Sequence, residues 1–185
     1  MKAKGNLERE IKYHSDDLEK LRERLRELEA ERKGPAAFED NWVLDRGDEL
    51  LSTGRILRLR TDGGKARVTF KGPLSLEGKL KVREEIEVEV SDAEETRAIF
   101  EQLGYRAVRR YQKMREEWQL GGVTIALDHT PIGGFAEFEG DGAETVSKRC
   151  GFDPKSAEPR TYLELYEDYV REHPEAPPEM VFRQA

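Results

Sequence analysis

The chain has 185 residues and a formal net charge of −7, from 32 Lys and Arg against 39 Asp and Glu. One cysteine is too few for a disulfide scaffold or a Cys-rich zinc site. There is no run of 18 apolar residues, and the N-terminus leads directly into charged sequence, so we expect a soluble, cytoplasmic protein with no membrane partner. The acidic balance argues against a nucleic-acid partner, which would favour a net basic face.

The chain shows no internal repeat and only one linker-like stretch, the Pro-rich segment 173–178. We therefore predict a single domain over residues 1–185. Its folded core should cover about residues 6–170, and a loose C-terminal tail should cover about residues 173–185.

Hydrophobic periodicity predicts the elements of the first half of the chain. A strand near 6–13 is followed by a helix with leucines at helical spacing over 18–28, with Ser15 as its N-cap. Strands then follow near 38–45, 55–61, 66–71 and 81–90. Ser91 and Glu94 form a capping-box pattern that predicts the start of a second helix, which ends at Gly104.

The second half predicts three further strands, near 108–119, 122–128 and 134–139, and then two helices. One helix lies near 143–150. The other carries the aromatic stripe of Tyr162, Tyr166 and Tyr169, which we interpret as packing rather than a cofactor site. The short connections favour antiparallel pairing, so the prediction is an α+β fold with roughly eight strands and four helices.

Alternation along these strands separates apolar from charged side chains. We expect helices to cover the apolar face, which carries Leu7, Ile11, Leu57, Leu59, Val68, Phe70, Ile86, Val88, Val90, Val123, Ile125 and Leu127. The opposite face carries Glu8, Glu10, Lys12, Arg58, Arg60, Thr69, Lys71, Arg83, Glu85, Glu87, Lys113, Arg115, Asp128, Glu137 and Glu139.

The charged face has two interpretations. It could be the solvated side of an antiparallel sheet, with ion pairs of small value. Two observations favour a binding site instead. Arg outnumbers Lys on this face, and Arg suits bidentate phosphate recognition. Carboxylates also occur as same-face pairs, Glu8 with Glu10 and Glu137 with Glu139, and repulsion within each pair would favour a divalent cation.

A triphosphate would match this combination of charges. It carries about four negative charges, which must be neutralised while an oxygen attacks phosphorus in line. Same-face residues two apart on a strand are about 6.5 to 7 Å apart, so carboxylates from neighbouring strands could flank one or two metal ions. Oxygen ligands select a hard ion such as Mg²⁺ or Mn²⁺ over zinc.

Other catalytic constellations are not supported. His14, His129 and His173 are too scattered for a zinc site, and Cys150 has no paired histidine, so it is interpreted as a core thiol. The glycine pairs at 63–64 and 121–122 fall between strands and predict hairpin turns rather than a P-loop.

These residues resemble the CYTH superfamily, the triphosphate tunnel metalloenzymes named for class IV adenylate cyclase and thiamine triphosphatase. Its Glu-x-Glu-x-Lys signature matches residues 8–12. Further segments agree in order and spacing: 39–45, 57–60, 69–72, 83–87, 113–115, 127–128, 132–139 and 161–165. Trp42 and Val43 depart from the family, which often has tyrosine in this strand, and Thr161 stands where serine is common.

The resemblance implies an eight-stranded antiparallel β tunnel, a closed barrel with helices packed on the outside. It implies catalytic roles for Glu8, Glu10, Lys12, Glu137 and Glu139. The implied metal ligands are Glu8, Glu10, Asp128, Glu137 and Glu139, with Glu85 and Glu87 as further ligands. The implied phosphate-binding residues are Lys12, Arg58, Arg60, Lys71, Arg83, Lys113 and Arg115.

Three functions follow from the resemblance, in this order. The first is a metal-dependent triphosphatase acting on inorganic triphosphate or a triphosphorylated small molecule. The second is a class IV adenylate cyclase that converts ATP to cyclic AMP and pyrophosphate, and the third is a non-catalytic polyphosphate or nucleotide-binding module. The sequence contains no motif for an adenine pocket, and it leaves open whether the chain forms a homodimer.

Overall fold

Eight strands form a closed antiparallel barrel in the computed structural model, which describes residues 6–183. They are β1 (Asn6–His14), β3 (Ala37–Asp45), β4 (Ile56–Asp62), β5 (Lys65–Lys71), β7 (Leu80–Val90), β8 (Arg106–Leu120), β9 (Val123–Thr130) and β10 (Gly133–Glu139). Their order is β1-β10-β9-β8-β3-β4-β5-β7, and β1 also pairs with β7, which closes the barrel. The predicted strands and the closed tunnel are confirmed.

Two short strands lie outside the eight. β2 (Glu31–Arg32) pairs with β8, and β6 (Ser75–Glu77) pairs with β7. Two short 3₁₀ helices, η1 (Leu51–Thr53) and η2 (Pro154–Ser156), occupy connections. The sequence did not predict these elements because segments of two or three residues are too short to show a period.

The strand register places the charged side chains on the inner surface of the barrel. Across β1 and β10, Glu10 lies opposite Glu139 and Lys12 lies opposite Glu137. Directly opposed residues of antiparallel strands point to the same face, so the alternation in each strand brings its charged residues into one shared interior.

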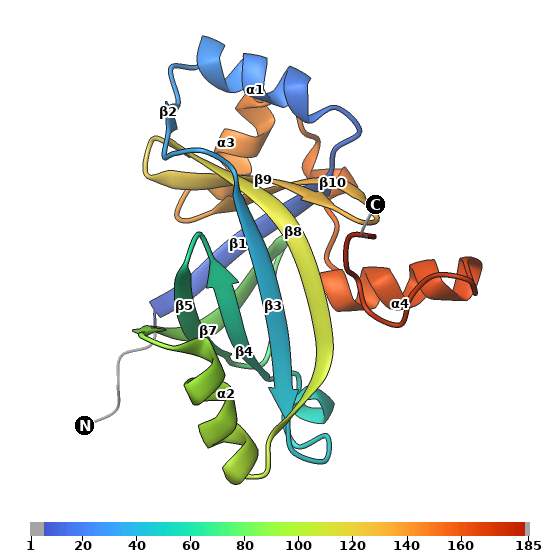
Figure 1. Ribbon diagram of the computed structural model, residues 1–185. Coiled ribbons are helices and arrows are strands. Elements are labelled where there is room, and N and C mark those ends of the chain that lie inside the picture. The colour runs from blue at the N-terminus through green and yellow to red at the C-terminus, as the bar shows by residue number, and fades with distance from the viewer. Residues whose placement is uncertain (1–5, 184–185) are drawn as a thin grey trace.

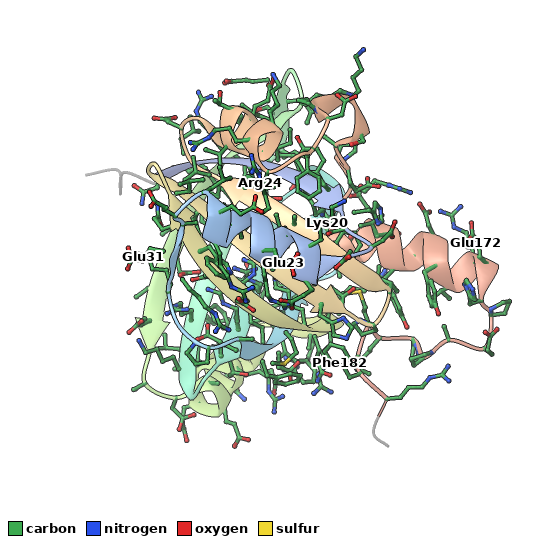
Figure 2. All side chains as sticks on the ribbon, turned by 90° about the horizontal axis from the view of Figure 1, so that it is seen from above. Lys20, Glu23, Arg24, Glu31, Glu172 and Phe182 are labelled. Atoms are coloured by element: carbon green, nitrogen blue, oxygen red, sulfur yellow. The ribbon has the colours of Figure 1, made fainter. Side chains whose placement is uncertain are left out.

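Four helices lie outside the barrel: α1 (Leu18–Glu27), α2 (Ala93–Gln102), α3 (Ala143–Arg149) and α4 (Tyr162–Glu172). Figure 1 shows α1 and α3 over one end of the barrel beside β9 and β10, α2 at the opposite end, and α4 beside β8. α1 buries Leu21 and Leu25 against the outer side chains of β9 and β10. The exposed side of this helix carries Lys20, Glu23 and Arg24 (Figure 2).

Both predicted N-caps are displaced in the structure. α1 is capped by Asp17, whose carboxylate accepts from the Lys20 amide, and not by Ser15. α2 is capped by Asp92, which accepts from the Glu95 amide, and not by Ser91. In each case the aspartate immediately precedes the first helical residue, where a side chain reaches the free amides of the first turn.

The expectation that helices cover the whole apolar face is wrong on the β7 side. Leu7, Ile86 and Val88 are 58%, 40% and 56% exposed. The reason is the position of α2, which packs Phe100 against a cluster centred on Leu44, Leu57 and Leu59. That cluster belongs to β3 and β4, so the adjacent outer surface of β7 and β1 is left uncovered.

The expected loose tail is also wrong for the part of it that the structure describes. The amide of Gln112 donates to the carbonyl of Met180 at 2.8 Å, and Met180 is only 1% exposed. Phe182 stacks on His129. The chain therefore turns back from the far end of α4, marked by Glu172, and packs against β8 (Figure 2). Across residues 6–183, none of the helices is long and apolar enough to cross a membrane.

Candidate active site

A cavity of about 380 Å³ lies inside the barrel and is lined mainly by charged side chains. Every predicted site residue except Asp128 lines it: Glu8, Glu10, Lys12, Arg58, Arg60, Lys71, Arg83, Glu85, Glu87, Lys113, Arg115, Glu137 and Glu139. These residues come from β1, β4, β5, β7, β8 and β10. The tertiary structure thus brings together residues that are up to 131 positions apart in the sequence.

The two carboxylates of β1 are held by lysines and arginines from neighbouring strands. Glu8 lies 2.7 Å from Nζ of Lys71 and 3.2 Å from Nε of Arg83. Glu10 lies 2.7 Å from Nζ of Lys81. Both carboxylates are almost fully buried, and these ion pairs compensate for the cost of burying the charges.

Sequence reasoning missed Lys81 as a member of this set. It is 5% exposed and lines the cavity. The available signal was its position two residues before Arg83 on the same face of β7, which places both side chains inside the barrel.

A second buried network joins β3, β4, β8 and β10. Arg115 pairs with Glu137, and Arg60 donates to Glu39 at 3.2 Å. Burial alone would raise the pKa of Glu39, but Lys113, Arg115 and Arg60 outweigh this effect and hold the pKa at about 2. Glu39 is therefore ionised and serves as a fixed negative charge that orients the cations beside it.

Asp128 lies behind the cavity wall, and none of its surface is exposed. Its carboxylate accepts two hydrogen bonds from Arg115, at 2.7 and 2.6 Å, and one from Lys113 at 3.0 Å. It also accepts a hydrogen bond from the Tyr162 hydroxyl at 2.7 Å. Since both oxygens are occupied, the structure does not place Asp128 with the carboxylates that face the cavity, and its contacts are those of a positioning residue.

Glu139 differs from the other inner carboxylates because it makes no ion pair with any residue between 6 and 183. Partial burial raises its pKa, and the nearby charges of Glu8 and Glu10 raise it further, to about 7. Glu139 therefore experiences net repulsion from the carboxylates around it.

The inner carboxylates have the donor chemistry of a site for a hard divalent cation. Their oxygens suit Mg²⁺ or Mn²⁺, and a cation beside Glu139 would relieve its repulsion from Glu8 and Glu10. Among the described residues no three His, Cys, Asp or Glu side chains are already grouped as a metal centre. The inner carboxylates are not grouped in this way because Glu8 and Glu10 form ion pairs with Lys71, Lys81 and Arg83 instead.

Lys12 and Tyr162 contact each other in the cavity lining. The Lys12 ammonium is 1% exposed and lies 4.3 Å from the centroid of the Tyr162 ring. Burial lowers the pKa of Lys12 to about 8. Tyr162 was expected only to pack, yet it contacts both Lys12 and Asp128. The missed signal is that it opens α4, directly after the capping residue Thr161, where the helix meets the barrel.

The protein has a tunnel fold: its antiparallel barrel is closed, with charged side chains inside and apolar side chains outside. The family described as the CYTH domain matches residues 6–162. The chain therefore belongs to the CYTH family, which is a family of enzymes.

Known proteins agree with this assignment. A protein of Methanocaldococcus jannaschii named "Putative adenylate cyclase MJ0240" is 34% identical over 134 residues, which are 72% of this chain and 76% of the relative. A Vibrio parahaemolyticus structure, described by the same activity name, has a TM-score of 0.78 at 22% identity and covers 88% of this chain and 99% of its own. The HpAC1 structure from Hippeastrum is described as having a dominant triphosphatase activity. It has a TM-score of 0.60 at 17% identity, and the match covers 89% of this chain and 87% of the HpAC1 chain.

Proposed function

We propose that this protein is a divalent-metal-dependent triphosphatase that hydrolyses inorganic triphosphate or a triphosphorylated small molecule inside the barrel. The observation that carries the proposal is the lining of the cavity. Seven predicted cations and six predicted carboxylates face one enclosed volume, and one of those carboxylates, Glu139, has no cationic partner among the described residues.

The cations of the lining supply the affinity for phosphate. Arg58, Arg60 and Arg115 present planar donor groups that suit phosphate oxygens, while Lys12, Lys71 and Lys113 act as point charges. A bound triphosphate would compete with Glu8 for Lys71 and Arg83. Substrate binding would thereby free carboxylate oxygens that the ion pairs now occupy.

The carboxylates Glu8, Glu10 and Glu139 would hold the metal, with Glu85, Glu87 and Glu137 as neighbours. When bound, Mg²⁺ or Mn²⁺ would neutralise phosphate charge and polarise the phosphoryl group. The chain itself contributes orientation, because strand backbones fix the positions of these side chains and Asp128 holds Arg115 and Lys113 in place. Hydrolysis would break the bond between the terminal phosphorus and its bridging oxygen, transfer that phosphoryl group to water as orthophosphate, and release the remaining diphosphate.

The second candidate is an adenylate cyclase. It is favoured by the name of the Methanocaldococcus jannaschii relative, at 34% identity. In that reaction the 3′-hydroxyl of ATP attacks the α-phosphorus and pyrophosphate leaves. The same cations would bind the polyphosphate in both reactions, so the lining does not distinguish them.

A product assay tests the proposal. The purified protein is incubated separately with inorganic triphosphate, ATP and thiamine triphosphate, with Mg²⁺ or Mn²⁺, and the products are identified. Release of orthophosphate supports the triphosphatase, whereas cyclic AMP with pyrophosphate supports the cyclase. Absence of turnover with every substrate and both metals would contradict both and leave a binding module.

A further inference from the structure

Asn41 is a fully buried amide on the inner face of β3. Its neighbours along that face are Glu39 and Val43, and none of the surface of Asn41 is exposed. Neither the nitrogen nor the oxygen of its side-chain amide has a hydrogen-bond partner. Across residues 6–183 it is the only residue with two such buried side-chain atoms. The fold therefore gains nothing from the polarity of this side chain.

An unpartnered buried amide destabilises a folded protein. Most buried donors and acceptors are paired, and an unpaired group costs free energy because it has lost its contacts with water. An apolar side chain avoids this cost, as Val43 does two residues further along the same face of β3. Folding alone does not account for an amide at position 41, and the neighbours of Asn41 across the sheet indicate its role.

Two residues of the candidate active site flank Asn41. The strand register places Asn41 directly opposite Arg60 of β4 on one side and opposite Tyr111 of β8 on the other. Directly opposed side chains of antiparallel strands have Cβ atoms about 4.5 to 5.5 Å apart, so their polar groups are within reach of each other. Arg60 and Tyr111 line the cavity, but Asn41 does not. Asn41 can therefore act on a substrate only through another side chain.

Arg60 uses its donors unevenly. One terminal nitrogen of its guanidinium donates to Glu39 at 3.2 Å and the other donates to Glu87 at 3.4 Å. The third donor, Nε, is buried and makes no hydrogen bond with the described residues. It lies 3.4 Å from a carboxylate oxygen of Asp62, which already accepts from Arg67 at 2.8 Å. Arg60 and Asn41 thus each contain a buried polar group without a partner, on directly opposed positions of two strands.

Phosphate binding would change the contacts of Arg60. A triphosphate held by its two terminal nitrogens would draw them away from Glu39 and Glu87. The guanidinium would then lose the contacts that orient it, and Nε would be the donor left to attach it to the barrel wall. An amide oxygen suits this attachment because it is neutral. It fixes the direction of the guanidinium without competing with the phosphate as a second negative charge.

We propose that Asn41 is a positioning residue for Arg60, and that its amide oxygen accepts a hydrogen bond from Nε of Arg60 when the terminal nitrogens of that arginine bind phosphate. This inference rests on the proposed function, because it takes Arg60 as a phosphate-binding residue. Asn41 lowers the stability of the protein alone and raises its affinity for triphosphate.

The test measures stability and affinity on the same variant. Asn41→Leu replaces the amide with an apolar side chain of similar size. Without triphosphate, its melting temperature should rise by about 2–6 °C, because two unpaired buried atoms are removed. Its Kd for inorganic triphosphate, measured by calorimetry with Mg²⁺, should rise about 10-fold, because Arg60 loses its acceptor. A residue with only a structural role would instead lose stability and affinity together.

A double-mutant cycle shows whether Asn41 acts through Arg60. When Asn41→Leu is added to Arg60→Ala, it should raise the Kd by less than about 2-fold, because the side chain that Asn41 positions is already absent. When it is added to Arg83→Ala, it should keep its effect of about 10-fold. Arg83 also lines the cavity, but it belongs to β7, which does not pair with β3.

Two further variants complete the experiment. Asn6→Leu makes the same chemical change at an exposed position outside the cavity lining, so it should alter neither the melting temperature nor the Kd. Asn41→Ala removes the amide without adding a larger apolar group. It should raise the Kd by the same factor as Asn41→Leu even if the leucine does not fit.

An unchanged Kd in both Asn41 variants, or an equal effect of Asn41→Leu on the Arg60→Ala and Arg83→Ala backgrounds, would overturn the inference. Turnover distinguishes this failure from failure of the proposed function. Hydrolysis of triphosphate with a Kd that does not depend on Asn41 would refute only the role of Asn41. Binding that depends on Asn41, without release of orthophosphate, would support Asn41 and refute the triphosphatase. A wild type that does not bind triphosphate would refute both.

Discussion

The Tyr162 hydroxyl donates a hydrogen bond to Oδ2 of Asp128 at 2.7 Å and so joins α4 to the buried wall of the barrel. Asp128 in turn accepts from Arg115 and Lys113, two of the cations that face the cavity. A residue of the outer helix is thus connected to the phosphate-binding side chains through one buried carboxylate.

Tyr162→Phe should weaken this connection while the aromatic ring remains over Lys12. Loss of a hydrogen bond to a charged group should lower the free energy of unfolding by about 1.5–3 kcal/mol. It should also lower kcat/KM roughly 10-fold, because Arg115 and Lys113 lose part of their support. Urea unfolding and steady-state kinetics measure the two effects.

Tyr166→Phe is the matched control on the same helix. Its hydroxyl donates to the carbonyl of Pro177 at 2.7 Å, outside the cavity. This variant should lose a similar or smaller amount of stability and keep its activity. Equal losses of activity in the two variants would show that Tyr162 acts only through stability.

Glu139→Gln should raise the stability of the metal-free protein and lower its metal-dependent activity. The raised pKa of Glu139 means that its ionised form is disfavoured in the folded protein, so stability falls as pH rises from about 4.5 through 7. At pH 8 without metal, the variant should melt about 1–3 °C above the wild type. Its metal-dependent turnover should fall roughly 100-fold or more, because a ligand charge is lost.

Glu84→Gln provides the comparison for Glu139→Gln, since Glu84 is exposed on the outer face of β7. It should alter neither the melting temperature nor the turnover. The ligand assignment would be rejected if Glu139→Gln kept wild-type turnover with both Mg²⁺ and Mn²⁺.

Arg60→Ala should weaken the binding of inorganic triphosphate. Arg60 lines the cavity and donates to Glu39, so the Glu39 carboxylate orients its guanidinium. Loss of a charged hydrogen bond costs about 1.5–3 kcal/mol, which is about a 10- to 150-fold higher Kd. Calorimetric titration measures this change, and Arg26→Ala on the exposed side of α1 should leave the Kd unchanged. An unchanged Kd in Arg60→Ala would remove Arg60 from the phosphate site.

Glu158→Gln should lower stability in a pH-dependent manner. The side-chain hydrogen bond from Arg160 is the main cause that lowers the pKa of Glu158 to about 2, and His14 contributes. The carboxylate therefore stabilises the fold above about pH 4.5, and this contribution is lost as the pH falls toward 2. Because Arg160 is half exposed, we expect only about 1–2 kcal/mol at neutral pH.

The measurement is the difference in unfolding free energy between the wild type and Glu158→Gln at several pH values. The difference should be constant above pH 5 and shrink below it. If this difference in unfolding free energy does not depend on pH, Glu158 stabilises the fold through packing and not through its charge.

The sequence by itself determined the eight barrel strands, the four helices and the division of side chains between two faces. These follow from short-range rules, because alternation in a strand assigns each residue to one side. For the same reason the inward positions of Glu10, Arg58 and Glu139 could be predicted from their spacing.

Only the tertiary structure decided how those inward residues are paired. The sequence placed Asp128 on the inner face. That its carboxylate accepts hydrogen bonds from Arg115, Lys113 and Tyr162 depends on strand register and on the docking of α4. The same holds for the pairing of Lys81 with Glu10 and for the exposed outer surface at Val88. These are contacts between segments distant in sequence, and no local period encodes which distant segment will be the neighbour.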